Sequence, residues 1–350
     1  MYCLPKTTVE VQETVEIFQR RYLGNKIGVL DLIGEVLQSA VGPYCSFCDI
    51  FAGTGTVSQR FNSNVVKILS NDILFSNYVP LYAWLSPEKC NWGRIADMID
   101  VLNDIEPIGE NYVSRHFGNA FFSLDNAIKI GEIREAIEGV TTSFKEKAVL
   151  LSSLLYAMDK VANTVGHYDA YRAKMDSFKP LELRMPQIQD INNIGNEVYN
   201  LDANTLIRQV DCDVLYLDPP YNSRQYCDLY HVLENVIRWE KPAVYGKAKK
   251  FDRCTLKSKY NCKEASRAMA DLISRAKTRY ILLSYNNMGS KGDPRSNARI
   301  ADAEIIEILK SRGRVEIFER DYRMFTTGKT SISDNKERVF FCEVTKHALS

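Results

Sequence analysis

The sequence lacks long apolar runs and a strong charge of either sign, and both absences narrow what the protein can be. No hydrophobic stretch approaches the roughly 18 residues of a membrane-spanning helix, and residues 1–16 lack the basic-then-apolar pattern of a secretory signal. A net charge of +1 does not by itself indicate a polyanionic partner. There is no repeat or low-complexity segment. With 45% hydrophobic and 25% charged residues in 350, we expect one large or two ordinary globular domains.

The nine cysteines do not form a disulfide framework, because their spacing is irregular in a chain of this length. Cys45 and Cys48 form a C-x-x-C pair that could be half of a zinc site or a redox pair. No second C-x-x-C and no H-x-x-x-H accompanies it, and the pair lies in or beside an expected core strand. We therefore predict buried free thiols, no metal, and a reduced, cytoplasmic location.

Short β-prone segments alternate with helical periodicity along much of the chain. Helical patterns occupy residues 27–37, 268–276 and 301–309. This alternation predicts a mostly parallel α/β sheet. The last two strands have no helical pattern between them, which predicts an antiparallel pair at the end of the sheet. The expected strands are residues 46–52, 65–70, 198–201, 214–217, 280–284, 315–318 and 339–344.

Residues 87–196 break this rhythm. Residues 95–105 and 149–165 have apolar side chains at helical spacing, and no strong strand lies between them. A polar and aromatic stretch, residues 164–186, follows. We predict a largely helical insertion in a sheet domain that is formed by residues 1–86 and 197–350.

A glycine loop follows the first long strand in the motif "DIFAGTG" (49–55). Gly53 and Gly55 allow a tight turn and let a ligand approach the backbone closely. Ser58 occupies the third position of a dinucleotide fingerprint, where glycine or alanine is expected, and this disfavours a nicotinamide dehydrogenase. Asp72 ends the next strand, where an acidic residue can accept hydrogen bonds from ribose hydroxyls. Together these features favour an adenosine-containing ligand without identifying it.

The strand at residues 214–217 ends in "DPPY" (218–221). Two prolines fix φ and restrict the residue before them, so they would hold the Asp218 carboxylate, the Pro219 carbonyl and the Tyr221 ring in one arrangement. The motif stands at the carboxyl end of a strand in the same predicted sheet as the glycine loop. We therefore predict that the two share a site.

In this order, the motifs resemble those of the Dam-like (D12 class) DNA adenine-N6 methyltransferases, which use S-adenosylmethionine. The resemblance spans nearly the whole chain. It implies a Rossmann-like class I methyltransferase sheet and assigns residues 87–196 to target recognition. It also implies action on double-stranded DNA in the bacterial cytoplasm or nucleoid. Two alternatives stay open: a cognate restriction endonuclease that acts on the same site, or a methyltransferase that marks a genome alone. A monomer is the default expectation. The matching motifs are "RRYLGNK" (20–26), "DIFAGTG" (49–55), "ND" (71–72), "NLDAN" (200–204) and "DPPY" (218–221).

The resemblance implies a role for each motif residue. Asp218 and the Pro219 carbonyl would accept hydrogen bonds from the adenine amino group, and Tyr221 would stack on a base flipped out of the duplex. Pro220 completes this catalytic motif. Around the cofactor, the resemblance implies Asp49 at the ammonium, Asp72 at the ribose and Asp202 at the adenine amino group. Phe51, Gly53 and Gly55 would form the loop around it. Tyr22 and Lys26 would close the pocket, and Lys26 is suited to a carboxylate or carbonyl.

Basic side chains gather in residues 241–263, directly after the catalytic motif. Charge runs are usually solvated faces, but this position makes contact with DNA phosphates a reasonable expectation. Residues 163–172 resemble a segment that reaches the DNA in relatives, with an ordinary surface loop as the alternative. The candidate DNA-binding residues are Lys249, Lys250 and Lys257 in the basic segment, and Tyr168, Arg172 and Lys174 near the insertion's end.

Two other functions fit parts of this pattern. An RNA base amino-group methyltransferase, acting on adenine N6 or guanine N2, would also carry an Asp-Pro-Pro-aromatic motif. Such enzymes tend to be compact and to lack both a large insertion and the N-terminal Tyr-x-Gly-x-Lys motif that is present at residues 22–26. A DNA-binding protein without catalysis is disfavoured by the intact Asp218 and glycine loop.

Overall fold

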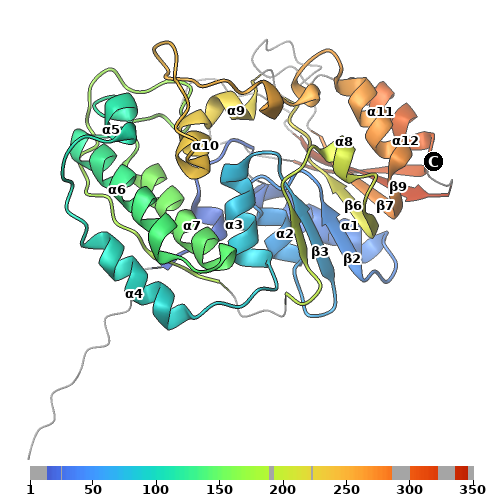
Figure 1. Ribbon diagram of the computed structural model, residues 1–350. Helices are drawn as coiled ribbons and strands as arrows, with labels where there is room; N and C mark the ends of the chain where they lie inside the picture. Colours follow the sequence, from blue (N-terminus) through green and yellow to red (C-terminus); the bar gives the residue numbers. More distant parts are fainter. Residues whose placement is uncertain are drawn as a thin grey trace, which may run out of the picture.

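A seven-stranded sheet in the order β5-β3-β2-β6-β7-β9-β8 forms the centre of the computed structural model (Figure 1). The structure describes residues 14–24, 26–188, 193–221, 224–285, 300–321 and 336–345. Residues 1–13, most of the segment expected to lack a secretory signal, lie outside these ranges. The strands are β2 (Ser46–Asp49), β3 (Lys67–Asn71), β5 (Glu197–Tyr199), β6 (Asp211–Leu217), β7 (Lys277–Ser284), β8 (Gly313–Asp321) and β9 (Lys336–Val344).

The sheet confirms the predicted mixture of strand directions. Strands β5, β3, β2, β6 and β7 pair in parallel, whereas β9 runs antiparallel to both β7 and β8. The predicted terminal antiparallel pair is therefore present, with the last strand lying between β7 and β8. A separate two-stranded sheet joins β1 (Thr14–Val15) to β4 (Met185–Pro186).

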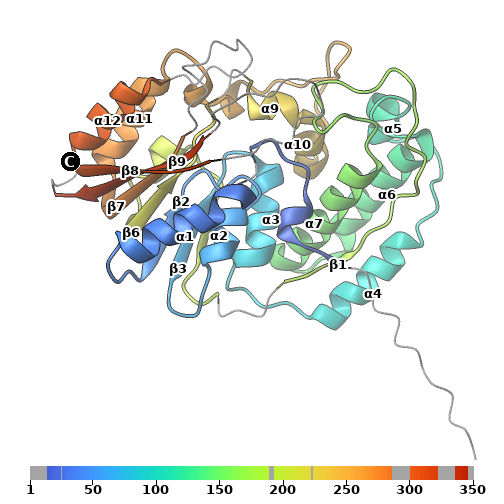
Figure 2. The ribbon, with the colours of Figure 1, turned by 180° about the vertical axis from the view of Figure 1, so that it is seen from behind.

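Helices cover both faces of the sheet, because alternate residues of its central strands bury apolar side chains on opposite sides. In β6, Val214 and Tyr216 belong to one hydrophobic cluster, and Leu215 and Leu217 belong to the other. The first face carries α1 (Leu30–Ser39), α2 (Thr56–Phe61) and α3 (Phe75–Leu85); the second carries α8 (Ala203–Leu206), α11 (Ala265–Arg275) and α12 (Asp302–Lys310) (Figures 1 and 2).

The region between α3 and β5 is largely helical, as predicted, and lies beside α3 (Figure 1). One continuous hydrophobic cluster runs from Phe47 in the sheet through Trp84 to Ile133 and Leu154 in this region. The helical block therefore extends one layer of the sheet domain and does not enclose a separate core. Its helices are α4 (Trp92–Asn103), α5 (Tyr112–Phe117), α6 (Leu124–Val140) and α7 (Phe144–Val161).

Buried polar contacts also tie the helical block to the sheet domain. The Lys145 ammonium donates to the backbone carbonyls of Tyr82, Ala83 and Ser86, at 3.2, 2.8 and 3.1 Å, where α3 ends. The Arg134 guanidinium donates to two carbonyls near the end of α10 (His231–Arg238). Cations at helix C-termini satisfy carbonyls that have no partner within the helix.

The C-x-x-C pair is only half buried. Cys48 is buried in β2, as predicted, but Cys45 is exposed, so that prediction was wrong for Cys45. Cys45 precedes the strand, and its backbone N–H donates to Asp213 Oδ2 at 2.7 Å. Both cysteines are free thiols. None of the helices in the described ranges is long and apolar enough to span a membrane.

Candidate active site

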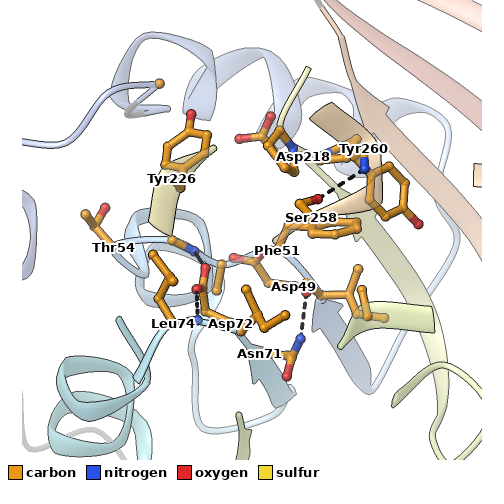
Figure 3. A pocket seen from close by; sticks show the side chains of 18 of the residues that line it. Asp49, Phe51, Thr54, Asn71, Asp72, Leu74, Asp218, Tyr226, Ser258 and Tyr260 are labelled. Atoms are coloured by element: carbon orange, nitrogen blue, oxygen red, sulfur yellow. Dashed lines mark hydrogen bonds between the residues drawn. The ribbon is translucent and has the colours of Figure 1, made fainter. Parts of the chain in front are cut away.

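A cavity of about 1010 Å³, including its open mouth, lies where β2, β3 and β6 end. Parallel strands present their carboxyl ends at one edge of a sheet, and ligands of α/β proteins bind there. The ends of these strands and the loops after them contain "DIFAGTG" (49–55), "ND" (71–72) and "DPPY" (218–221), and the cavity brings these motifs together with residues of the N-terminal motif (20–26) and of "NLDAN" (200–204). Figure 3 shows Asp49, Asp72 and Asp218 around it, with Phe51 and Tyr260 on one side and Tyr226 on the other.

The glycine loop turns tightly from β2 into α2. Gly53 and Gly55 have φ values of +55° and +86°, which favour glycine, and a Cβ at Gly55 would lie 2.6 Å from the Leu81 side chain. The Gly53 N–H donates to Asp72 Oδ2 at 3.0 Å, while the Leu74 N–H donates to Oδ1 at 2.8 Å (Figure 3). Asp72 therefore links the glycine loop to the loop after β3.

Two carboxylates in the cavity, those of Asp49 and Asp72, are buried and accept hydrogen bonds that stabilise them there. Asp49 is 1% exposed, and burial raises its pKa to about 7. Its Oδ2 accepts a hydrogen bond from the Ser58 hydroxyl at 2.9 Å, whereas its buried Oδ1 has no hydrogen-bond partner among the described residues. Burial likewise raises the pKa of Asp72 to about 6. Ser58 was notable in the sequence only because glycine or alanine is expected at its position, and in the structure its hydroxyl stabilises the Asp49 carboxylate.

The catalytic motif follows β6 and meets the N-terminal motif. Lys26 Nζ lies 2.9 Å from Asp218 Oδ1 and donates to the Tyr221 hydroxyl at 3.3 Å. Burial raises the pKa of Asp218, and the adjacent ammonium opposes this rise. Although burial lowers the pKa of Lys26, the Asp218 carboxylate and nearby tyrosines raise it well above the usual value. The carboxylate that Lys26 meets in this structure is therefore that of Asp218.

Three stacked tyrosines hold the N-terminal motif beside the cavity. Tyr22 stacks on Tyr226 and Tyr230, with ring centroids 5.2 and 4.6 Å apart. The Leu23 N–H donates to the Tyr230 hydroxyl at 2.7 Å, and the Tyr226 hydroxyl donates to the Leu23 carbonyl at 3.1 Å. Tyr226 begins α9 (Tyr226–Leu229), directly before α10, so this stack joins the chain's beginning to the segment after the catalytic motif.

Sequence reasoning missed one wall of the cavity. Ser258 and Tyr260 line it, and Gln225 forms two hydrogen bonds to the Ser258 backbone, at 2.9 and 2.8 Å. The Tyr260 ring packs edge-on against Phe51, 5.0 Å between centroids. Asp202, predicted at the cofactor's adenine, also lines the cavity, where it caps α8 by accepting from the Thr205 N–H. Tyr260 lies in the basic segment, residues 241–263, where no motif marks it as part of a site.

The predicted DNA-binding residues occupy different environments. Tyr168 is 2% exposed, and its hydroxyl donates to Asp159 Oδ1 at 2.9 Å, inside the core. The expectation that Tyr168 reaches DNA is therefore wrong. The segment is polar and aromatic, but the side chain of this tyrosine points into the core, where its hydroxyl finds a partner in Asp159. Arg172 and Lys174 are exposed, and Arg172 pairs with Asp176 at 2.9 Å.

The structure joins the two segments that were predicted to contact DNA. Lys250 Nζ lies 2.6 Å from Asp169 Oδ1, which links the basic segment to residues 163–176. Lys249, with φ +54°, occupies the turn closed by the Tyr245–Lys250 bridge, and Lys257 is exposed. Part of the positive charge in the basic segment is therefore balanced within the protein.

A mostly parallel sheet with an antiparallel end and a cavity at its carboxyl edge is consistent with a methyltransferase fold. Residues 22–292 match the family model described as D12 class N6 adenine-specific DNA methyltransferase. The chain belongs to this family and is an adenine-specific DNA methyltransferase.

Relatives of two lengths resemble the chain. It is 31% identical to the type II methyltransferase M.NlaIII of Neisseria lactamica, over 91% of this chain and 96% of that protein. It is 35% identical to the modification methylase StsI of Streptococcus sanguinis over 91% of this chain, and 32% identical to the type II methyltransferase M.FokI of Planomicrobium okeanokoites over 92%. The chain spans about half the length of these latter two, 50% and 52%.

Proposed function

We propose that the protein transfers a methyl group from S-adenosylmethionine to N6 of an adenine that is flipped out of duplex DNA. We also propose that it serves as the modification enzyme of a restriction–modification system, in which a cognate endonuclease cuts the same unmethylated site. Membership of the family and the names of the modification methylases it resembles support this proposal. The observation that carries it is that Asp218 and Pro219 line the same cavity as the glycine loop.

The residues of the cavity fit S-adenosylmethionine. Its lining contains four carboxylates, which suits a cofactor that carries a sulfonium and an ammonium. The buried Asp49 Oδ1, which has no hydrogen-bond partner among the described residues, is suited to the ammonium. Asp72 would hold the ribose hydroxyls, and Phe51 and Tyr260 would face the adenine. The cofactor supplies an electrophilic methyl group on sulfur. The four acidic residues are Asp49, Asp72, Asp202 and Asp218.

The catalytic motif would prepare the adenine amino group. The lone pair of this nitrogen is delocalised into the ring, so the nitrogen is a poor nucleophile. A carboxylate of Asp218 and the Pro219 carbonyl would each accept one N6 hydrogen, which favours a more tetrahedral nitrogen with an available lone pair. The Asp218 charge would stabilise the positive charge that develops on nitrogen. Tyr221 would stack on the base, whose removal from the duplex gives access to N6.

Neighbouring surfaces would hold the DNA. Arg172, Lys174, Lys249 and Lys257 lie outside the cavity, and contact with phosphates would give affinity that is independent of sequence. The exposed segment around Arg172 and the helical block are the proposed source of target recognition. Lys250 contributes less free charge, because it already pairs with Asp169.

Transfer of a tritiated methyl group to duplex DNA tests the proposal. Asp218→Ala should lower the rate by at least on the order of a hundredfold while cofactor binding survives. Asp211→Ala is the matched control, since Asp211 lies at the other end of β6 and its side chain is 70% exposed. Methylation of ribosomal RNA but not of DNA, or an active Asp218→Ala variant, would contradict the proposed function.

A further inference from the structure

Lys26 is the one cationic side chain among the described residues that line the cavity, and it meets one carboxylate out of four. Its ammonium lies 2.9 Å from Asp218 Oδ1, an atom that is fully buried. Asp49 and Asp72 are instead held by neutral donors, the Ser58 hydroxyl and two backbone N–H groups. The positive charge is therefore placed at the catalytic carboxylate.

Local structure fixes the position of this ammonium. Lys26 is 8% exposed, and its carbonyl accepts from the Val29 N–H at 2.9 Å at the start of a 3₁₀ helix, Ile27–Val29. Its Nζ also lies 5.2 Å from the centre of the Tyr221 ring, in addition to its contact with that hydroxyl. A lysine that served only as a solvated surface charge would not be buried against two residues of the catalytic motif.

We propose that Lys26 is a positioning residue for methyl transfer: its ammonium holds Asp218 Oδ1 and keeps that carboxylate ionised. The second Asp218 oxygen and the Pro219 carbonyl then accept the two amino hydrogens. This inference rests on the proposed function, because it assigns the charge state of the group that would bind the adenine. It gives Lys26 a task at the methyl acceptor and not at the cofactor.

The surroundings of Asp218 show why the ammonium matters. Burial raises the pKa of Asp218, and the Glu337 carboxylate adds to this rise, while Lys26 is the group that lowers it. Without Lys26, the remaining influences favour the protonated acid. A protonated Asp218 would accept one fewer hydrogen bond and would carry no charge to stabilise the methylated nitrogen. The titratable groups that face Asp218 are Lys26, Asp49, Tyr216, Tyr221, Tyr226 and Glu337.

The test is the pH profile of single-turnover methyl transfer to duplex DNA at saturating S-adenosylmethionine. The wild-type rate should fall at low pH as Asp218 gains a proton. In Lys26→Met this fall should move toward higher pH by about one to three pH units, and the rate should partly recover at high pH. Lys26→Arg should keep the wild-type profile because it keeps the charge.

Lys26→Gln separates charge from contact, since its amide can still donate to Asp218 but carries no charge. Its profile should move as that of Lys26→Met does, and it decides the question alone if Lys26→Met does not fold. Lys67→Met is the control, because Lys67 pairs with Glu197 on the edge strand outside the cavity.

The inference would be overturned if Lys26→Gln lost rate equally at every pH, with the low-pH fall in rate (the acid limb of the profile) at the same pH as in the wild type. Lys26 would then have a purely structural role. Tighter DNA binding with an unmoved limb would also overturn it, by showing that the ammonium merely competes with the base. A wild-type protein that does not methylate DNA would instead contradict the proposed function, so the two failures are distinguishable.

Discussion

Burial of Asp49 predicts that affinity for S-adenosylmethionine rises with pH. The pKa of Asp49 is raised to about 7, and only its ionised form can pair with the cofactor's ammonium. A group with this pKa is about one-tenth ionised at about pH 6 and about nine-tenths ionised at about pH 8. The ionisation of Asp49 should by itself therefore lower the dissociation constant about tenfold across this interval, or about 1.4 kcal/mol.

The stability of the cofactor-free protein should change in the opposite direction. Asp49 has a higher pKa in the folded state than in the unfolded chain, so the folded state holds the proton more tightly. The free energy of unfolding therefore falls as pH rises from about 4 to about 7 and then levels off. Asp49→Asn removes the buried charge, and it should stabilise the cofactor-free protein more at about pH 8 than at about pH 5.

Calorimetric titration with S-adenosylmethionine and thermal unfolding without it measure the two effects. Asp49→Asn should bind weakly, with a dissociation constant that stays flat within about twofold; Asp72, with a pKa near 6, accounts for that residual slope. Asp211→Asn, exposed on β6, should behave like the wild type. A flat wild-type dissociation constant, or a variant that keeps the tenfold dependence, would refute the assignment of Asp49 to the ammonium.

Two further predictions concern the glycine loop and the basic segment. Gly55→Ala should lose about 1–3 kcal/mol more unfolding free energy than Gly109→Ala in urea titrations. Both glycines have positive φ, but only a Cβ at Gly55 would meet core side chains, at 2.6 and 2.8 Å. Equal losses in the two variants would contradict this prediction. Replacing Lys249 and Lys257 by Gln should lower the salt dependence of DNA binding by about one unit per lost phosphate contact. Lys250→Gln should lower it less, since that ammonium already pairs with a carboxylate; an unchanged slope for all three would place them outside the DNA interface.

The sheet was predictable because buried strands are continuous and β-prone. The pattern found all seven strands of the main sheet, and the lack of a helical sequence pattern between the last two predicted that β9 (Lys336–Val344) runs antiparallel to β8. Helix α6 (Leu124–Val140), which packs against α5, α7, α4 and α10, was missed because its buried face is not uniformly apolar. Polar Asn126 and Arg134 are buried on the same face as Ile130 and interrupt the apolar pattern.

Site residues could be predicted where a short sequence motif fixes their position at the end of a strand. Contacts between residues far apart in the sequence could not be predicted. "DPPY" and the glycine loop follow their strands, so their shared edge could be inferred from the sheet. Lys26 and Tyr221 lie 195 positions apart, and no local pattern indicates their contact. The inward orientation of Tyr168 depends on Asp159 in another element, and the same tyrosine in an exposed loop would have an identical local sequence.

The continuous core of the sheet domain and helical block limits how this block, the proposed target-recognition region, can be exchanged between relatives. A transplanted block would carry half of the packing between Trp84 and Tyr156 into a protein that lacks the other half. Its Lys145 would also arrive without the three carbonyls that it caps. Hybrid enzymes should therefore be built by exchanging exposed segments such as residues 172–179 while the buried faces of α3 and α7 stay together.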